Sequence, residues 1–205
     1  MKKGTFLSMA GVIFITLSSF LLPLDGYKVG DKAMIFNLKN IDGKLVSLGQ
    51  DASAKGYIVV FTCNTCPVAK AYEERVLDLH TAYAAKGFPV IAINSNDASL
   101  SPGDSYEQMQ QRAKSKDYKF PYLIDETQEV AKTYGARSTP TVYVLKKNEK
   151  EFTVAYMGAI DNNSQDASAA TVQYVKSAVE SLLADKPVEI PSAKAVGCGI
   201  KWRKM

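Results

Sequence analysis

Two cysteines separated by two residues, Cys63 and Cys66, are the side chains of this sequence best suited to chemistry. They follow an apolar run at 57–61 and precede a long segment with helical periodicity. Cysteines at this spacing can close a small disulfide and open it again. At the start of a helix, the unpaired backbone N–H groups and the positive end of the helix dipole stabilise a thiolate. Because the thiolate is the reactive form of cysteine, the pattern predicts reversible redox chemistry at a strand-to-helix turn.

The composition is that of an ordinary globular protein. The chain has 205 residues, of which 46% are hydrophobic and 22% charged, and this suits one domain with short extensions. Its formal net charge is +4, and no basic stripe with interleaved aromatic residues is present. Nucleic-acid binding is therefore not expected.

The N-terminus has the pattern of an export signal. Lys2 and Lys3 precede a nearly uncharged stretch at 6–22. Residues 1–24 are therefore predicted to be a signal peptide or an N-terminal membrane anchor. A domain at 27–185 and a C-terminal tail at 186–205 would follow. The expected location is periplasmic or otherwise extracytoplasmic, with membrane anchoring through 6–22 as the alternative to cleavage, and disulfides persist there.

The hydrophobic pattern predicts an α/β domain with a mixed central β-sheet flanked by helices. A β-hairpin at 27–48 turns at Asp42-Gly43, and the crossover strands are expected to be parallel. The further elements expected are strands at 57–62, 89–93 and 121–124, helices at 67–86, 105–116 and 127–134, a hairpin of 141–145 with 152–156, and a last helix at 167–184. Residues 94–104 are predicted to be a loop, either a solvated connection or a border of the site.

Three segments resemble the thioredoxin superfamily, in its redoxin (AhpC/TSA-like) branch of extracytoplasmic proteins. They are the hairpin at 29–48, the strand end and turn at 61–67, and Ser138-Thr139-Pro140-Thr141. The resemblance extends from about residue 27 to 184. It implies a thioredoxin-like fold with an N-terminal β-hairpin extension.

The resemblance also implies roles for individual residues. Cys63 would be the solvent-facing nucleophile and Cys66 the resolving thiol, and the two would form a redox-active disulfide, Cys63–Cys66. Pro140 would be cis. The backbone of Thr139 would then bind an extended substrate segment beside the cysteines.

Two departures from the family concern proton transfer and reduction potential. Thr62 stands where many relatives have Trp, and Tyr57 stands where many thioredoxins have a buried acid. The candidates for taking over the proton transfer of that acid are Glu73, Glu74 and Lys70.

The main hypothesis is a thiol–disulfide oxidoreductase that forms mixed disulfides with protein substrates. It needs an external electron donor or acceptor, such as a membrane thiol reductase, and no cofactor. A peroxiredoxin-like peroxidase with antioxidant activity is an alternative, although Val60 and Thr62 are off register for its motif. Cu(I) handling by two thiolates is another. A zinc site that includes His80 is not expected, since fourteen helical residues place it ~20 Å from Cys66. A purely structural Cys63–Cys66 bond, in a protein that keeps the fold without turnover, is the remaining alternative.

Cys198 is the odd cysteine of the chain. It lies between Gly197 and Gly199 and shortly before Trp202, which indicates a docked tail. Cys198 is either a third redox thiol or a free thiol packed on the surface. Of the other notable side chains, His80 is predicted to be at the surface, and Tyr72 and Tyr83 in the core.

Overall fold

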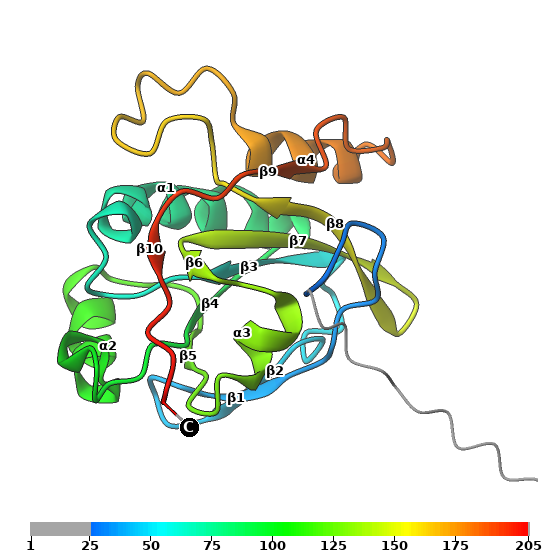
Figure 1. Cartoon of the computed structure of the whole chain (residues 1–205). Helices are drawn as coiled ribbons and strands as arrows, with labels where there is room; N and C mark the ends of the chain where they lie inside the picture. The colour runs from blue at the N-terminus through cyan, green and yellow to red at the C-terminus, as the bar shows by residue number, and fades with distance from the viewer. Residues whose placement is uncertain (1–25, 205) are drawn as a thin grey trace, which may run out of the picture.

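The computed structural model describes residues 26–204, so the leader predicted at 1–24 lies outside the described residues (Figure 1). Its centre is an eight-stranded sheet in the order β2-β1-β5-β4-β3-β7-β8-β9. The strands are β1 (Asn37–Asn40), β2 (Leu45–Ser47), β3 (Gly56–Phe61), β4 (Val90–Asn94), β5 (Tyr122–Ile124), β7 (Thr141–Asn148), β8 (Glu151–Gly158) and β9 (Ser192–Ala193). A separate two-stranded sheet joins β6 (Ser138–Thr139) to β10 (Cys198–Gly199). The helices are α1 (Pro67–Tyr83), α2 (Tyr106–Ser115), α3 (Glu129–Tyr134) and α4 (Tyr174–Leu183), with 3₁₀ turns at Ala84–Lys86 and Pro102–Asp104.

The sheet is mixed, as the sequence predicted. Strands β3, β4 and β5 are parallel, whereas β7 and β8 form the antiparallel hairpin beside β3. All six residues of β3 are buried, as expected for an apolar strand with a neighbour on each side and helices on its faces. The predicted N-terminal hairpin is also confirmed, and its first strand pairs with β5 at the sheet edge.

Two apolar layers cover the sheet. Helices α1, α2 and α4 pack on one face, where Tyr72 and Tyr83 lie in the core as predicted. Helix α3 and the N-terminal segment pack on the other face. Within residues 26–204, no helix has the length and apolar content needed to cross a membrane.

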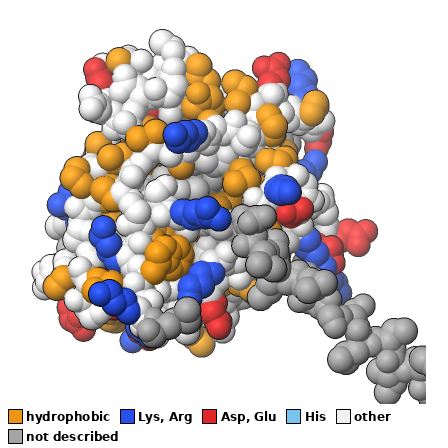
Figure 2. Space-filling model, in the orientation of Figure 1, with side chains coloured by type: hydrophobic (Ala, Val, Ile, Leu, Met, Phe, Trp, Pro, Cys, Tyr) orange, Lys and Arg blue, Asp and Glu red, His pale blue; other side chains and the backbone are white. Residues whose placement is uncertain are grey.

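The C-terminal tail returns to the domain after α4 (Figure 1). Strand β9 pairs in parallel with β8, and the chain then crosses to β6, where β10 pairs antiparallel. These two strand pairings confirm the docked tail that the sequence predicted. On the face that the tail crosses, basic side chains lie scattered among apolar and uncharged ones, and acidic side chains lie mainly toward the periphery (Figure 2).

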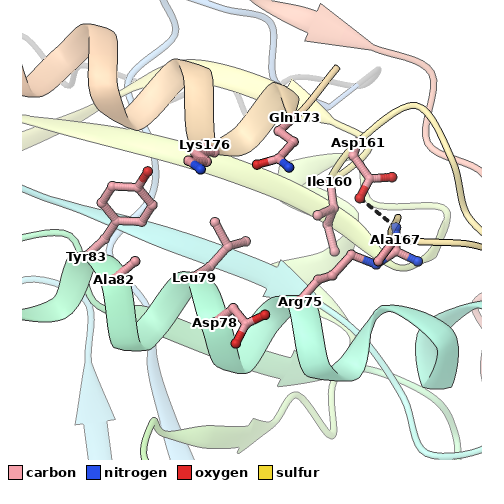
Figure 3. A pocket seen from close by; sticks show the side chains of 10 residues that line it. All are labelled: Arg75, Asp78, Leu79, Ala82, Tyr83, Ile160, Asp161, Ala167, Gln173 and Lys176. Atoms are coloured by element: carbon pink, nitrogen blue, oxygen red, sulfur yellow. Dashed lines mark hydrogen bonds and ion pairs between the residues drawn. The ribbon is translucent and has the colours of Figure 1, made fainter. Parts of the chain in front are cut away.

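A cavity of about 320 Å³ lies between α1 and the segment that leads into α4 (Figure 3). Arg75 and Tyr83 contribute to it from α1, and Asp161 and Gln173 from the other side. No cysteine lines this cavity. The predicted cysteine site therefore lies elsewhere in the molecule.

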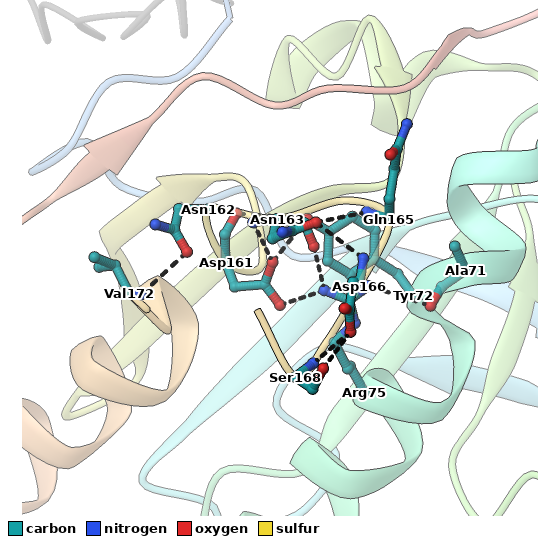
Figure 4. Close-up of polar contacts among 10 residues, drawn as sticks. All are labelled: Ala71, Tyr72, Arg75, Asp161, Asn162, Asn163, Gln165, Asp166, Ser168 and Val172. Carbon is teal, nitrogen blue, oxygen red and sulfur yellow. Dashed lines mark hydrogen bonds and ion pairs between the residues drawn. The ribbon is translucent and has the colours of Figure 1, made fainter. Parts of the chain in front are cut away.

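The prediction that the last helix begins at residue 167 is wrong, because α4 begins at Tyr174. The preceding loop is held by side-chain bonds to its own backbone (Figure 4). The Asn163 amide oxygen accepts from the N–H groups of Gln165 and Asp166, and the Asp166 carboxylate accepts from Ser168. Such local bonds compete with helical hydrogen bonds, so the helix begins only after this loop.

Candidate active site

The two cysteines of the turn lie between β3 and α1, as the sequence predicted. Cys66 is the N-cap residue of α1, with extended backbone angles (φ −70°, ψ 123°), and Pro67 occupies the first turn. A proline is tolerated there because its missing N–H would have had no helical partner. Cys63 is only 6% exposed and Cys66 only 2%. The expectation of a solvent-facing Cys63 is therefore wrong in this structure, since both cysteines are packed with Ala69 and Cys198 in one cluster.

The disulfide of the structure joins Cys66 to Cys198, and Cys63 is a free thiol. This differs from the predicted Cys63–Cys66 bond. The physical reason is the course of the tail, since the pairing of β10 with β6 places Cys198 opposite Thr139. The Cα atoms of Cys66 and Cys198 are then 5.8 Å apart, within the usual range for a disulfide, although 132 residues separate them in sequence. Cys198 therefore belongs to the site and is not a free surface thiol.

Thr139 contacts the sulfur atoms of both turn cysteines. The peptide bond between Thr139 and Pro140 is cis, which confirms the prediction for this loop. The Thr139 hydroxyl lies 3.1 Å from Sγ of Cys63, and the Thr139 carbonyl oxygen lies 3.3 Å from Sγ of Cys66. The hydroxyl is thus placed to donate a hydrogen bond to a thiolate at Cys63.

We expect Thr139→Val to slow alkylation of Cys63 by iodoacetamide about fivefold at neutral pH, because one hydrogen bond to the thiolate is lost. The rate is measured on oxidised protein, in which Cys63 is the single thiol among the three cysteines. Thr141→Val is the control, since the Thr141 hydroxyl donates to the Ser138 carbonyl. Equal rates in wild type and Thr139→Val would show that the hydroxyl does not act on Cys63.

A buried carboxylate, Asp104, fixes the residues between the cysteines. Asp104 is 0% exposed, and its carboxylate accepts hydrogen bonds from the Asn64 backbone N–H at 2.6 Å and the Thr65 hydroxyl at 2.7 Å. It also accepts from Ser101 and Asn96, which come from its own loop. The interpretation of 94–104 as a solvated connection is therefore wrong, and this loop borders the site. The sequence does not indicate this role for Asp104, because a lone aspartate in a polar loop carries no positional signal.

Asn64 is held on its other sides as well. Its side-chain amide donates to the Gly103 carbonyl, and its amide oxygen accepts from the Tyr122 hydroxyl of β5. Tyr122 is fully buried, and burial raises the pKa of its phenol well above the ordinary value. Tyr122 is therefore a neutral donor, and the turn between the cysteines is rigidly positioned.

Two candidates for replacing the missing acid, Glu73 and Lys70, line a small cavity together with Cys63, and its volume of about 10 Å³ is roughly the space of one water molecule. Of the two, Glu73 is buried and Lys70 is exposed. The Glu73 carboxylate accepts two hydrogen bonds from Arg112, at 2.8 and 2.7 Å, and one from Tyr118. Burial alone would raise the pKa of Glu73, but these hydrogen bonds outweigh it and hold the pKa below its ordinary value. Glu73 is thus kept as an anion and is a poor proton acceptor for a thiol at neutral pH.

The other residues considered for proton transfer are less well placed. Tyr57 is buried and packs edge-to-face on Phe152. Glu74 and Lys70 are exposed. The prediction of a surface position for His80 is wrong, since its ring is half-buried, lies against Phe120 and accepts the Val90 N–H. Burial lowers the pKa of His80, so it is a neutral structural acceptor.

Comparison with known proteins agrees with this fold. Residues 29–151 match the AhpC/TSA family. The chain belongs to this family. The thiol-disulfide oxidoreductase ResA of Oceanobacillus iheyensis is 30% identical over 144 residues, which cover 68% of this chain and 71% of that protein.

Two solved structures have folds similar to that of this family member. An uncharacterized conserved protein from Geobacillus kaustophilus is 35% identical, with a TM-score of 0.80 over 91% of this chain and 95% of the other. The exposed lipoprotein thioredoxin of Streptococcus pneumoniae strain TIGR4 is 22% identical, with a TM-score of 0.54 over 72% of this chain and 99% of the other. This second likeness concerns the fold alone. The chain therefore has the thioredoxin-like fold that the sequence predicted.

Proposed function

We propose that this protein is a thiol–disulfide oxidoreductase in which Cys63 attacks and Cys66 resolves disulfides of protein substrates. The observation that carries the proposal is the meeting of three sulfur atoms at the N-terminus of α1, one as a free thiol and two in a disulfide. The name of the relative from Oceanobacillus iheyensis supports the same activity. The cis Thr139–Pro140 loop beside the sulfurs is the proposed binding site for substrate backbone.

The proposed cycle starts from three reduced cysteines. The Cys63 thiolate attacks a substrate disulfide, forms a mixed disulfide and releases one substrate thiolate. Cys66 then attacks Cys63, which releases the second substrate thiolate and leaves a Cys63–Cys66 bond. The substrate has gained two electrons, and the protein has lost two.

A third exchange connects this cycle to the disulfide seen in the structure. The Cys198 thiolate attacks Cys66, a Cys66–Cys198 bond forms, and Cys63 leaves as a thiolate. The number of disulfides is unchanged by this step. The predicted Cys63–Cys66 bond is then a transient intermediate, and the bond in the structure is the resting oxidised state.

The setting of the reaction is also part of the proposal. The signal-like residues 1–24 would direct the protein to an extracytoplasmic compartment, with the periplasm as the compartment we expect, either as a processed protein or anchored through 6–22. Its electrons would come from an external thiol donor, such as a membrane thiol reductase.

Turnover in an insulin-reduction assay with dithiothreitol as donor tests the function. We expect Cys63→Ser to lower the rate to that of dithiothreitol alone, because the attacking sulfur is lost. Peroxide consumption with the same donor is measured in parallel to separate a peroxidase from a disulfide reductase. Undiminished insulin reduction by Cys63→Ser would contradict the proposal.

A further inference from the structure

We propose that Cys198 is the sulfur atom at which an external thiol reduces the resting protein, so that electrons enter the site through the C-terminal tail. This inference rests on the proposed function, whose cycle ends at the Cys66–Cys198 bond. It assigns a catalytic role to a residue of the tail. It also identifies the reacting partner as a thiol that approaches the tail from solvent.

The tail is held against the site independently of the disulfide. Cys198 pairs with Thr139 and Gly199 with Ser138 in an antiparallel register, and the Ile200 N–H donates to the Arg137 carbonyl. Farther along, the backbone N–H groups of Lys201 and Arg203 donate to the side-chain oxygens of Asn96 and Gln128. The reduced Cys198 would therefore return to its place beside Cys66 whenever substrate backbone leaves the Thr139 edge, ready to close the bond again.

The pairing of β10 with β6 also occupies the edge at Thr139 that the family resemblance assigns to substrate backbone. An external thiol that arrives at the oxidised protein cannot add a strand there while the tail is docked. Reduction of the resting disulfide must therefore begin at a sulfur that is reachable without strand addition.

Access favours Cys198 over Cys66. Cys66 is 2% exposed, whereas Cys198 is partly exposed and lies between two exposed glycines, Gly197 and Gly199. A thiolate attacks a disulfide along the S–S axis, from the side opposite the leaving sulfur. The approach to Cys198 therefore comes from the side away from buried Cys66, toward solvent. The approach to Cys66 would have to come from inside the protein.

The position of the leaving sulfur also favours attack of the external thiol at Cys198. Cys66 is the N-cap of the 17-residue helix α1, where the helix dipole stabilises a departing thiolate. Cys198 lies in the two-residue strand β10, outside the helix whose first turn Cys66 caps. The exchange is therefore expected to expel Cys66 and not Cys198.

The chemistry balances with a dithiol or two thiol molecules as reductant. The first thiolate bonds to Cys198, and the Cys66–Cys198 bond breaks with its electron pair on Cys66. The second thiolate attacks the sulfur of the first, a new external disulfide forms, and Cys198 leaves as a thiolate. The reductant has lost two electrons, and the protein has gained two thiols.

Gly197 and Gly199 provide a matched pair of variants for the docking of β10. A Cβ atom at Gly197 would lie 2.0 Å from the Thr139 carbonyl oxygen, whereas one at Gly199 has its nearest neighbour, the Arg137 carbonyl oxygen, at 4.0 Å. Gly197→Ala must therefore push β10 away from β6, and Gly199→Ala should leave it in place. In glutathione redox buffers we expect Gly197→Ala to lower the equilibrium constant for the Cys66–Cys198 bond by about tenfold or more, with Gly199→Ala close to wild type. Equal constants in all three proteins would overturn the role of the docked strand.

The deciding experiment maps the first adduct of an external thiol. Oxidised full-length protein is mixed briefly with reduced glutathione, quenched with acid, alkylated with N-ethylmaleimide and digested for mass spectrometry. We expect glutathione on Cys198 and maleimide on Cys66, with adduct on Cys198 about tenfold or more above that on Cys66. The same measurement on Cys63→Ser excludes migration of the adduct through Cys63. Glutathione mainly on Cys66, or a disulfide that glutathione does not open, would overturn the inference. Because the mapping requires no substrate turnover, its failure is distinguishable from failure of the proposed function.

Discussion

Asp104→Ala is expected to lower the free energy of unfolding by about 3 kcal/mol or more, because the donors of two buried and two part-buried hydrogen bonds lose their acceptor at once. The variant removes the partner of the Asn64 N–H, the Thr65 and Ser101 hydroxyls and the Asn96 amide. Each buried donor left without a partner costs about 1–3 kcal/mol in desolvation, although a water molecule admitted to the space would recover part of this. The stability is measured by urea unfolding followed by tyrosine fluorescence.

Asp166→Ala is the control for the predicted loss of stability in Asp104→Ala. Asp166 is exposed and accepts hydrogen bonds from Ser168 in a surface loop, so its loss should change the free energy of unfolding far less than the loss of Asp104. The rate at which iodoacetamide alkylates Cys63 should also differ between Asp104→Ala and wild type, since the turn that carries the thiol is no longer held. A urea-unfolding midpoint and slope of Asp104→Ala equal to those of wild type would refute the structural role assigned to Asp104.

Glu73→Gln is expected to destabilise the protein at neutral pH by about 2–3 kcal/mol, because it leaves Arg112 without its carboxylate. The side chain of Glu73 is 7% exposed, and that of Arg112 is 26% exposed, so Arg112 is partly rehydrated after the substitution. Glu74→Gln is the matched control one residue away. The Glu74 side chain is 71% exposed and pairs with Lys116, so its substitution should cost less than about 1 kcal/mol.

The pH dependence of the same variant gives an independent test. The pKa of Glu73 in the folded protein lies below its ordinary value of 4.5, despite burial, because Arg112 and Tyr118 hold the anion. The folded state therefore binds the proton less tightly than the unfolded state. The stabilisation is complete above about pH 5 and is lost as the pH falls through 4.5 toward the folded-state pKa. The difference in unfolding free energy between wild type and Glu73→Gln should accordingly shrink on acidification. A difference that grows below pH 4.5 would show that Glu73 is not held as an anion.

Features that depend on neighbouring residues were predictable from the sequence. The position of Cys63 and Cys66 between β3 and α1 follows from an apolar strand, a proline at the helix start and a helical stripe. The order of strands and helices follows from the same periodicities, and the cis Pro140 loop follows from the family resemblance. The main error in the elements, the start of α4, arose because polar loop residues with helical spacing formed bonds with their own backbone.

Sequence alone determined that a cysteine pair lies at a strand-to-helix turn, since strand, turn and helix signals extend over only a few residues, and the family resemblance indicated the thioredoxin-like fold. The tertiary structure decided which sulfur atoms are bonded and which groups hold them. Cys198 reaches Cys66 across 132 residues because the tail pairs with β6, and Asp104 reaches the turn from a loop about 40 residues away. Such contacts depend on the complete path of the chain, and no local pattern specifies that path.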